Sequence, residues 1–362
     1  MYPKPSIGCK RTLIDKLEKC GIRGLSLKLL RSYISDREQA VHIGDMKSDE
    51  STIKDFGCSQ GTSIGPLLFL IYVNNLAEQE YKGKIFMFAD DVALVSTGKT
   101  WREAHDSAEE DLRTIGRWMN ANSLTVNASK SAFMNISRKH DAKSSLEEPL
   151  VYHTCEGALC NCPSLKQVES MIYLGITFDH RLNWEHHINN LCQKLRKCAY
   201  VLYGIKYFSG KLVKNIYQAL FESILQYGIL IWGGAFKHLI NKVFRIQKIT
   251  LKVLFGKPRR YATETLFKEL KLATIHQLYS KNMLNFIGKE KDIFFTDVRK
   301  RKSEAYRLKL PKVHHKYAQM TTKYRGMLMI NRDFDQIIAL LNIKIKNKQK
   351  KEIHNFIMNK PV

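Results

Sequence analysis

Two adjacent carboxylates, Asp90 and Asp91, stand in the middle of an otherwise apolar segment from Lys84 to Val95. Like charges held side by side repel each other, so such a pair needs a stabilising partner. A divalent cation provides one, because hard carboxylate oxygens are the ligands that Mg²⁺ or Mn²⁺ takes, usually together with waters and substrate phosphates. In phosphoryl and nucleotidyl transfer, two such ions hold the attacking and leaving oxygens. The alternative is a solvated acidic turn without a ligand.

The elements around this pair are expected to hold it at the end of a hairpin. Apolar residues on both sides of it predict two strands that meet at the carboxylates. Upstream, a loop with glycine and proline, Gly61 to Pro66, opens an apolar helix that runs to about Ala77. Two β-type runs between Arg37 and Cys58 predict a further hairpin with its turn at Asp45 to Glu50.

The second half of the chain has a different pattern. From Glu185 onward, apolar residues recur at spacings of three and four, which indicates helices with one buried face. The first of these helices would bury one face, formed by Ile188, Leu191, Cys192, Leu195, Ala199 and Leu202. The predicted fold class is therefore α+β up to about residue 184 and all-α afterwards.

The glycine loop and the acidic pair together resemble two motifs of one enzyme family. Residues 60–69, QGTSIGPLLF, followed by Tyr72 and Asn75, are similar to the sequence Q-G-S-x-L-G-P-L-L-F-x-x-Y-x-N-D of reverse transcriptases, in particular those of non-LTR retrotransposons of the LINE or Jockey kind. Residues 88–91, FADD, resemble the F/Y-A-D-D motif of the same family. Two positions differ from the family pattern: Ser59 stands where proline is usual, and Asn75 where aspartate is usual.

The resemblance implies roles for these residues. Asp90 and Asp91 would be catalytic and bind the metal ion, while Gln60, Gly61, Phe88 and Ala89 would line the incoming nucleotide and the template. Gly61 lacks a Cβ atom, so that its backbone can approach a nucleotide closely. The alternative for Gly61 is a glycine that only permits a tight turn.

Further matches follow in the order that the family has them. Trp118, Asn120, Leu124, Val126, Asn127 and Lys130 fit the pattern W-x-x-x-N-x-L-x-x-N-x-x-K, which implies that Lys130 lies near the triphosphate. There a cation would offset developing charge; the alternative is a solvated lysine. Tyr173, Leu174 and Gly175 resemble the primer-grip turn. The resemblance covers roughly residues 13 to 260.

The family's third catalytic carboxylate has no match. It belongs to a strand of the type F-x-D-x-x-K-A-F-D, ahead of a helix of the type L-L-x-K-L-x-x-x-G-I-x-G. Leu13 to Gly24 match the helix, but Ser6 to Lys10 do not match the strand, and counting back places the aspartate at or before Met1. We therefore expect an N-terminally truncated reverse transcriptase that does not polymerise DNA by itself. The alternative is a catalytically inert, basic relic that binds RNA or RNA/DNA duplex.

Three regions follow from the resemblance. Residues 1–184 would form a partial palm with the primer grip, an antiparallel sheet with helices that lacks the fingers and the first catalytic motif. Residues 185–256 would form a helical thumb, and residues 257–362 a basic helical C-terminal region. The implied partners are an RNA template, a DNA primer and dNTPs.

A second cluster has the residue types of a metal site. His153, Cys155, Cys160 and Cys162 gather four soft ligands within ten positions. Zinc binds Cys and His tetrahedrally, but structural sites usually use pairs separated by two to four residues, and a single intervening residue strains the chelate. The alternative to zinc is a reduced, cysteine-rich loop.

The net charge points to a polyanion as partner. Lys and Arg number 59 against 34 Asp and Glu, a formal charge of +25, and such a field attracts nucleic acid or anionic surfaces. No acidic residue lies between Glu222 and Glu264. Within this stretch Lys242, Arg245, Lys248 and Lys252 recur along one helical face. This face is expected to follow the phosphates of a template–primer duplex.

The remaining patterns concern the compartment. No apolar stretch reaches the roughly 20 residues of a membrane span, and no apolar segment of a secretory signal follows Met1. The eight cysteines are expected to be reduced. These patterns favour an intracellular protein, cytoplasmic or nuclear, that is not secreted and has no membrane partner.

Overall fold

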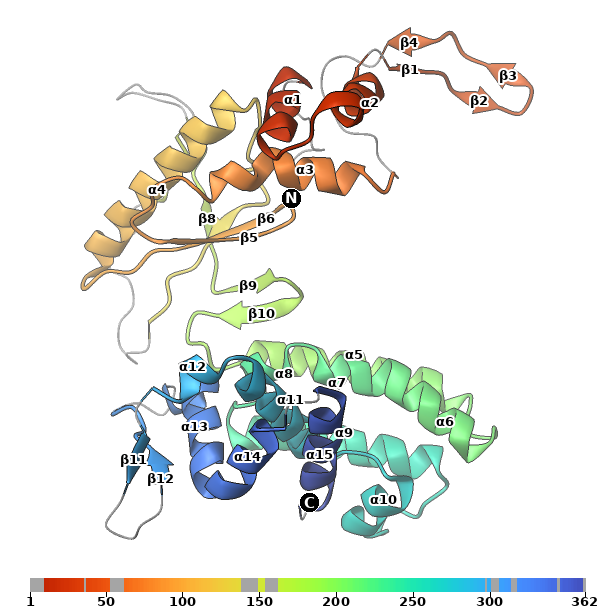
Figure 1. The fold of residues 1–362 in the computed structure, drawn as a ribbon. Helices are drawn as coiled ribbons and strands as arrows, with labels where there is room; N and C mark the ends of the chain where they lie inside the picture. Colours follow the sequence, from red (N-terminus) through yellow and green to blue (C-terminus); the bar gives the residue numbers. More distant parts are fainter. Residues whose placement is uncertain are drawn as a thin grey trace. The chain divides into compact units, whose positions relative to one another are not determined.

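The structure is a computed structural model, and it describes residues 10–35, 37–52, 62–137, 149–153, 162–296, 298–300, 306–313, 318–343 and 346–360. The chain divides into two compact units, Met1–Leu174 and Gly175–Val362. Helices and short strands are mixed in the first unit, whereas helices dominate the second (Figure 1). The predicted α+β class is confirmed at this level.

In the described part of the first unit the α-helices are α1 (Lys10–Lys19), α2 (Gly24–Ile34), α3 (Gly65–Val73) and α4 (Trp101–Ala121). The predicted glycine- and proline-containing opening of α3 is confirmed, because Gly65 and Pro66 form its first turn and the Thr62 hydroxyl accepts a hydrogen bond from the Gly65 N–H at 3.2 Å. A 3₁₀ turn, η1 (Asn74–Leu76), extends it to the predicted end. The core of this unit includes Leu13, Leu17, Leu68, Tyr72 and Met119.

The hairpin that carries the acidic pair is confirmed. β5 (Lys84–Phe88) pairs antiparallel with β6 (Asp91–Val95), so that Phe88 lies opposite Asp91. Figure 1 shows it on the side of α3 opposite to α1 and α2. The hydrophobic core explains this position, because Ile85, Met87, Val92 and Leu94 pack against it.

The other predicted hairpin exists with a different turn. β2 (His42–Ile43) pairs with β3 (Met46–Lys47), and β1 (Glu38–Gln39) pairs with β4 (Ser51–Thr52). The chain therefore reverses at Gly44 and Asp45, and the predicted turn at Asp45 to Glu50 is wrong. Gly44 has a φ of 60°, which a glycine adopts at little cost. The unit also contains a short parallel ladder, β7 (Ala132–Phe133) with β8 (Lys166–Gln167), and the strand β9 (Ser170–Tyr173).

One lysine ties three helices of this unit together. The Lys16 ammonium on α1 donates hydrogen bonds to the Tyr72 carbonyl at 2.6 Å, to Asn75 Oδ1 at 3.0 Å and to Asn122 Oδ1 at 2.8 Å. It also lies over the Tyr72 ring, 4.4 Å from its centroid. Burial lowers the pKa of Lys16 from its ordinary 10.5 to about 8, and the charge of Lys19 adds to this effect. The charged form is therefore present at pH 7, although the hydrogen-bond acceptors given above are neutral oxygens and Glu78 acts on it only through its charge.

This network predicts a stabilising substitution, Asn75→Asp. Because the pKa of Lys16 is lower in the folded chain than in the unfolded one, its contribution to stability rises with pH between about 8 and 10.5. A carboxylate at position 75 would raise that pKa, reduce this rise and stabilise the first unit at pH 7 by about 1 kcal/mol. Urea unfolding at pH 7 and pH 10 measures both effects. The exposed neighbour Asn74→Asp is the control, and equal effects at both positions would contradict the expectation.

The second unit opens with β10 (Ile176–Asp179) and α5 (Glu185–Tyr203). The predicted apolar face of α5 is confirmed: five of its six members are buried, and Ala199 is partly buried and packs against the same core. Its further helices are α6 (Gly210–Tyr217), the π-helical turn η2 (Gln218–Glu222), α7 (Ser223–Gln226), α8 (Ile229–Trp232), α9 (Lys237–Leu254), α10 (Thr263–Leu270), α11 (Ile275–Lys289), α12 (Lys291–Phe294), η3 (Ala318–Met320), α13 (Thr322–Arg332), α14 (Phe334–Leu341) and α15 (Lys346–Met358).

The cores of this unit follow the chain order. One hydrophobic cluster runs from Ile176 to Leu278, and it includes residues on both sides of the expected boundary at 256. A second cluster involves residues from Met283 to Ile357. The prediction of an all-helical region after residue 184 is wrong, because β11 (Val298–Lys300) pairs with β12 (Tyr306–Leu308). These short, charged strands lack the apolar alternation that identifies a strand in a sequence.

Candidate active site and nucleic-acid interface

Ala89 and Asp90 form the two-residue turn between β5 and β6, Asp91 is the first residue of β6, and both carboxylate side chains are exposed. Ala89, the first residue of the turn, has a φ of 52°. A left-handed backbone conformation at this place is typical of a tight hairpin turn, where glycine is preferred. For an alanine this conformation costs on the order of 1 kcal/mol. The turn directs two carboxylates away from the core into solvent.

The two faces of the hairpin differ. Residues Ile85 and Met87 of β5 pack against the core, whereas Phe86 and Phe88 between and after them are 50% and 63% exposed. This alternation follows from the period of two along a strand. Phe88 therefore presents an uncovered aromatic ring next to the acidic pair.

Tyr173, a residue of the predicted primer grip, lies near this turn. Burial raises the pKa of Tyr173, and the negative charge of Asp91 raises it further. The electrostatic effect means that the first unit brings the end of β9 and the acidic turn together. Leu174 and Gly175 follow with φ of 47° and 75°, the conformation of a two-residue hairpin turn.

Gly175 is confined in the second unit. A Cβ atom on Gly175 would lie 3.3 Å from Cε1 of Tyr227, so that the tyrosine ring packs directly on the glycine backbone. Both the positive φ and this close approach explain why a glycine stands at the position.

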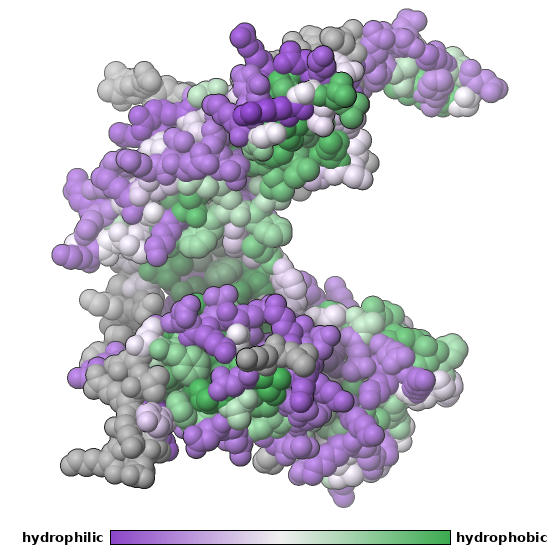
Figure 2. Space-filling view, in the orientation of Figure 1, coloured by the Kyte–Doolittle hydropathy of each residue, from purple (hydrophilic) through white to green (hydrophobic). Residues whose placement is uncertain are grey.

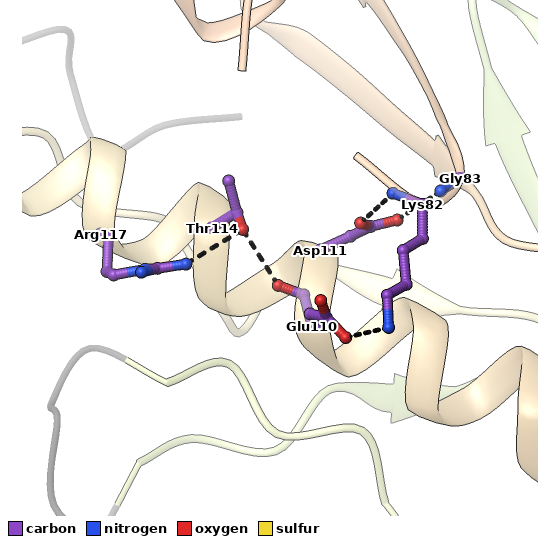
Figure 3. A network of polar contacts seen from close by, with 6 residues as sticks. All are labelled: Lys82, Gly83, Glu110, Asp111, Thr114 and Arg117. Atoms are coloured by element: carbon purple, nitrogen blue, oxygen red, sulfur yellow. Dashed lines mark hydrogen bonds and ion pairs between the residues drawn. The ribbon is translucent and has the colours of Figure 1, made fainter. Parts of the chain in front are cut away.

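An aspartate that we did not predict holds the start of the hairpin. Asp111 of α4 is 1% exposed, and its carboxylate accepts hydrogen bonds from the backbone N–H groups of Lys82 and Gly83, both at 2.8 Å (Figure 3). A Cβ on Gly83 would lie 2.9 Å from Asp111 Oδ2 and 2.7 Å from the Val95 carbonyl oxygen. The glycine therefore lets the two elements touch. The signal in the sequence is an acidic residue at helical spacing among apolar ones, Ala108, Leu112 and Ile115.

The residues of Figure 3 surround Asp111 with a second layer of polar contacts. The Lys82 ammonium pairs with Glu110, and the Thr114 hydroxyl donates to the Glu110 carbonyl at 3.2 Å and accepts from Arg117 at 3.4 Å. Lys82, Glu110 and Arg117 are exposed and Thr114 is half-buried, so each contact contributes little to stability. Asp111 is the member of this group that positions the hairpin.

Lys130 is exposed at the end of a turn that Asn127 organises. The backbone N–H of Lys130 donates to the Asn127 carbonyl at 3.1 Å, and the Ser129 hydroxyl donates to Asn127 Oδ1 at 2.6 Å. The turn explains why an asparagine belongs in this pattern. The role of Lys130 near a triphosphate stays a prediction.

Several predicted site residues lie outside the described residues: Gln60, Gly61, Cys155 and Cys160. His153 and Cys162 are described, but within the described ranges no group of three or more His, Cys, Asp or Glu side chains could hold a metal ion. The zinc prediction therefore has no support.

For Mg²⁺, the acidic turn offers a partial fit. Two exposed carboxylates are hard oxygen donors, and their exposure leaves room for the waters and substrate phosphates that complete magnesium coordination. They do not form a closed cage by themselves. The donor set suits an ion that arrives with a phosphate group.

The basic face predicted on α9 is present in the second unit. Leu239, Val243, Ile246, Gln247, Thr250, Leu251 and Leu254 are buried, and Lys242, Arg245, Lys248 and Lys252 lie on the opposite side of the helix. Three of the four have contacts within the unit. Lys242 Nζ lies 4.0 Å from Glu185 Oε1, Lys248 lies over the Phe244 ring, and Lys252 donates to the Arg259 carbonyl at 2.7 Å. Arg245 is exposed and takes part in none of these.

Residues 11–178 match the family described as reverse transcriptase (RNA-dependent DNA polymerase). The matched segment contains the acidic turn, Lys130 and Tyr173 to Gly175, the residues predicted to form a primer grip. The similar proteins are polymerases of non-LTR retrotransposons. The RNA-directed DNA polymerase from mobile element jockey of Drosophila melanogaster is 24% identical over 255 residues, which are 67% of this chain and 26% of that protein.

Two further relatives come from the same fly. The probable RNA-directed DNA polymerase from transposon X-element is 25% identical over 264 residues, 70% of this chain and 27% of the relative. The probable RNA-directed DNA polymerase from transposon BS is 26% identical over 265 residues, 70% of this chain and 28% of the relative. The chain thus spans about a quarter of the length of the relatives it matches. Within its described part, no helix is both long enough and apolar enough to cross a bilayer.

Proposed function

We propose that the chain serves template-directed nucleotidyl transfer, with an RNA template, a DNA primer and dNTPs as its partners. In this proposal, residues up to 184 act as a palm that supplies Asp90 and Asp91, and residues 185–256 act as a thumb that binds the duplex. The observation that carries it is the acidic turn, exposed at the end of a hairpin inside the segment that matches the reverse transcriptase family.

The chemistry of the residues supports these roles. Asp90 and Asp91 would hold a divalent ion, which offsets the charge of the triphosphate when it is bound. Phe88 and Ala89 would contact the nucleotide or template base, and Tyr173, Leu174 and Gly175 would hold the primer end beside the carboxylates. Lys242, Arg245, Lys248 and Lys252 would follow the phosphate backbone, and we expect Arg245 to contribute most because it is exposed.

Duplex binding predicts a specific effect of Arg245→Ala. Loss of one phosphate contact should weaken binding of an RNA/DNA duplex and lower the slope of log K against log salt by about one. Fluorescence anisotropy between 50 and 300 mM salt measures both quantities, and thermal unfolding should be unchanged. The control is Lys268→Ala on α10, which removes the same charge from a lysine that pairs with Glu264 at 2.8 Å. An equal loss of duplex affinity in both variants would mean that the net charge of the chain, and not a phosphate contact of Arg245, determines binding.

Primer extension tests the catalytic half of the proposal. In the described residues the turn offers two carboxylates and no third acidic ligand, whereas the family pattern has a third. We therefore expect the purified chain to bind duplex and not to extend the primer. Robust Mg²⁺-dependent extension that disappears in Asp90→Ala would contradict this expectation. Absence of duplex binding would contradict the wider proposal.

The alternative function is binding without chemistry, by a basic scaffold for RNA or RNA/DNA duplex. The same α9 face favours it. Mg²⁺ titration separates the two, because only the polymerase proposal expects the affinity for dNTP and Mg²⁺ together to fall in the double variant Asp90→Asn, Asp91→Asn. Isothermal titration with dTTP measures this affinity.

A further inference from the structure

The junction between α5 and α6 exposes a group of aromatic side chains. Tyr200, Tyr203, Tyr207 and Phe208 are 83%, 48%, 87% and 58% exposed, and we name this group the aromatic turn. Hydrophobic residues reach the surface where α5 and α6 meet, next to hydrophilic ones (Figure 2). Exposed aromatic rings in one place are unusual on a soluble surface unless they bind something.

The aromatic turn is held firmly by residues that point inward. Leu202 and Val213 are each 1% exposed, and Ile205 packs against the same core. The backbone N–H of Ile205 donates to the Leu202 carbonyl at 3.0 Å, and that of Phe208 donates to the Ile205 carbonyl at 3.1 Å. The rings thus project from an ordered backbone, which lowers the entropic cost of binding.

A lysine fixes two of the rings. The Lys206 ammonium lies 4.0 Å from the centroid of the Tyr203 ring and 4.7 Å from that of Tyr207, and it donates a hydrogen bond to Tyr203 Oη at 2.6 Å. These contacts raise the pKa of Lys206, the hydrogen bond to Tyr203 most of all. The positive charge is therefore permanent and sits between two aromatic faces.

The surroundings of the aromatic turn are basic. The sequence has no acidic residue between Glu185 and Glu222, and it has six basic ones there: Lys194, Arg196, Lys197, Lys206, Lys211 and Lys214. Glu222 itself is buried, and burial raises its pKa. A Cβ on Gly210 would lie 3.9 Å from the Phe255 ring, so the exposed Arg259 and Arg260, which follow shortly after Phe255, belong to the same end of the unit.

We propose that the aromatic turn binds unpaired nucleotides of single-stranded nucleic acid. Every base has a face that stacks on an aromatic ring, and a basic surround holds the phosphates, which together give sequence-tolerant binding. The charge argues for this ligand, because a surface of rings among an excess of cations is complementary to a polyanion with planar bases. The proposal goes beyond the duplex binding assigned to α9, and it does not depend on extension of a primer.

The test compares single-stranded and duplex ligands with the full chain. We expect the double variant Tyr200→Leu, Tyr207→Leu to bind a fluorescent 12-nucleotide oligouridine about tenfold or more weakly, since each stacked base contributes substantially. Leucine keeps apolar area and removes the stacking face. Binding of a fully paired RNA/DNA duplex should change less than twofold. The matched control is Tyr306→Leu on β12, a ring that is 52% exposed and remote in sequence.

Cross-linking locates the ligand independently of affinity. An oligonucleotide with 5-iodouridine should cross-link to the tryptic peptides 198–206 and 207–211. Unchanged oligouridine affinity in the double variant would overturn the proposal, and so would an equal loss for duplex and single strand. The proposal would also fail if the double variant only abolished self-association in sedimentation velocity or binding to anionic vesicles, because the rings would then serve a protein or membrane contact.

Discussion

We expect the Asp111→Ala variant to lower the free energy of unfolding of the first unit by about 3 kcal/mol. The carboxylate is buried and accepts two backbone N–H groups at 2.8 Å each, and hydrogen bonds to a charged group contribute about 1.5 to 3 kcal/mol. Its loss leaves the amides of Lys82 and Gly83 without an acceptor at the start of β5. Urea unfolding gives the free energy, and hydrogen exchange at these two amides should accelerate.

The graded variant Asp111→Asn separates hydrogen bonding from packing. Its amide keeps one acceptor oxygen and the size of the side chain, so we expect a loss between those of the wild type and of alanine. The control is Glu110→Ala, the neighbouring acid, which is exposed and pairs with the Lys82 side chain. Its cost should stay within about 0.5 kcal/mol. Equal costs for Glu110→Ala and Asp111→Ala would show that net charge, and not the two backbone bonds, is decisive.

The Asp111→Ala substitution also tests whether the stability of the hairpin matters for the candidate site. Because Asp111 anchors the start of the strand that leads to Asp90, its loss should loosen the acidic turn before the whole unit unfolds. Metal-dependent dNTP binding should then weaken in Asp111→Ala at temperatures where the unit is still folded. Retained dNTP affinity would mean that the turn is positioned from elsewhere.

The parts of the fold that could be predicted are those with a local period. The acidic hairpin followed from apolar residues on both sides of Asp90 and Asp91, and the inner face of α5 from spacings of three and four. In both cases the pattern within a dozen residues determines which side chains are buried. The position of a turn is harder to predict. Glycine and the polar residues that follow it are all typical of turns, so the pattern did not identify Gly44 and Asp45 as the place where the chain reverses.

The contacts that position the site could not be predicted because their partners are far away in the chain. Asp111 binds backbone amides 28 and 29 residues earlier, and Lys16 binds Asn122, 106 residues later. Lys16 was matched to a family pattern without a structural reason, and the structure supplies one. The amides that Asp111 binds are groups that nearly every residue carries, and nothing near Lys16 in the sequence identifies Asn122 as its acceptor.

Among the predicted site residues, the sequence analysis was strongest where a motif coincides with a turn. Asp90 and Asp91 lie next to each other at the end of the hairpin, and the charge of Asp91 acts on Tyr173, while the metal site and the primer grip stay predictions. The four basic residues of α9 share one face because helix geometry alone requires it. Their differing contacts, such as the bond of Lys252 to the Arg259 carbonyl, depend on a loop that helix geometry does not specify.

Gln247→Ala should cost the second unit about 4 kcal/mol. Gln247 is fully buried in α9, where its Nε2 donates to Tyr217 Oη at 3.2 Å and to the Ala273 carbonyl at 3.0 Å, and its Oε1 accepts from the Ile275 N–H at 3.0 Å. Truncation leaves three buried polar groups without this partner, each at about 1 to 3 kcal/mol, partly offset by relaxation. Chemical unfolding measures the loss, with Gln193→Ala at an exposed position of α5 as the control.

Comparison of Gln247→Ala with Arg245→Ala separates the contribution of α9 to folding from its contribution to binding. Gln247 faces the core and Arg245 faces solvent, two positions apart on α9. At a low temperature, where Gln247→Ala is still folded, we expect its affinity for RNA/DNA duplex to stay within twofold of the wild type. Arg245→Ala should show the reverse, with unchanged stability and weaker binding. A loss of duplex affinity in Gln247→Ala with a native circular dichroism spectrum would contradict this expectation. Binding by the basic residues would then depend on the exact position of α9, as specific phosphate contacts do and simple charge attraction does not.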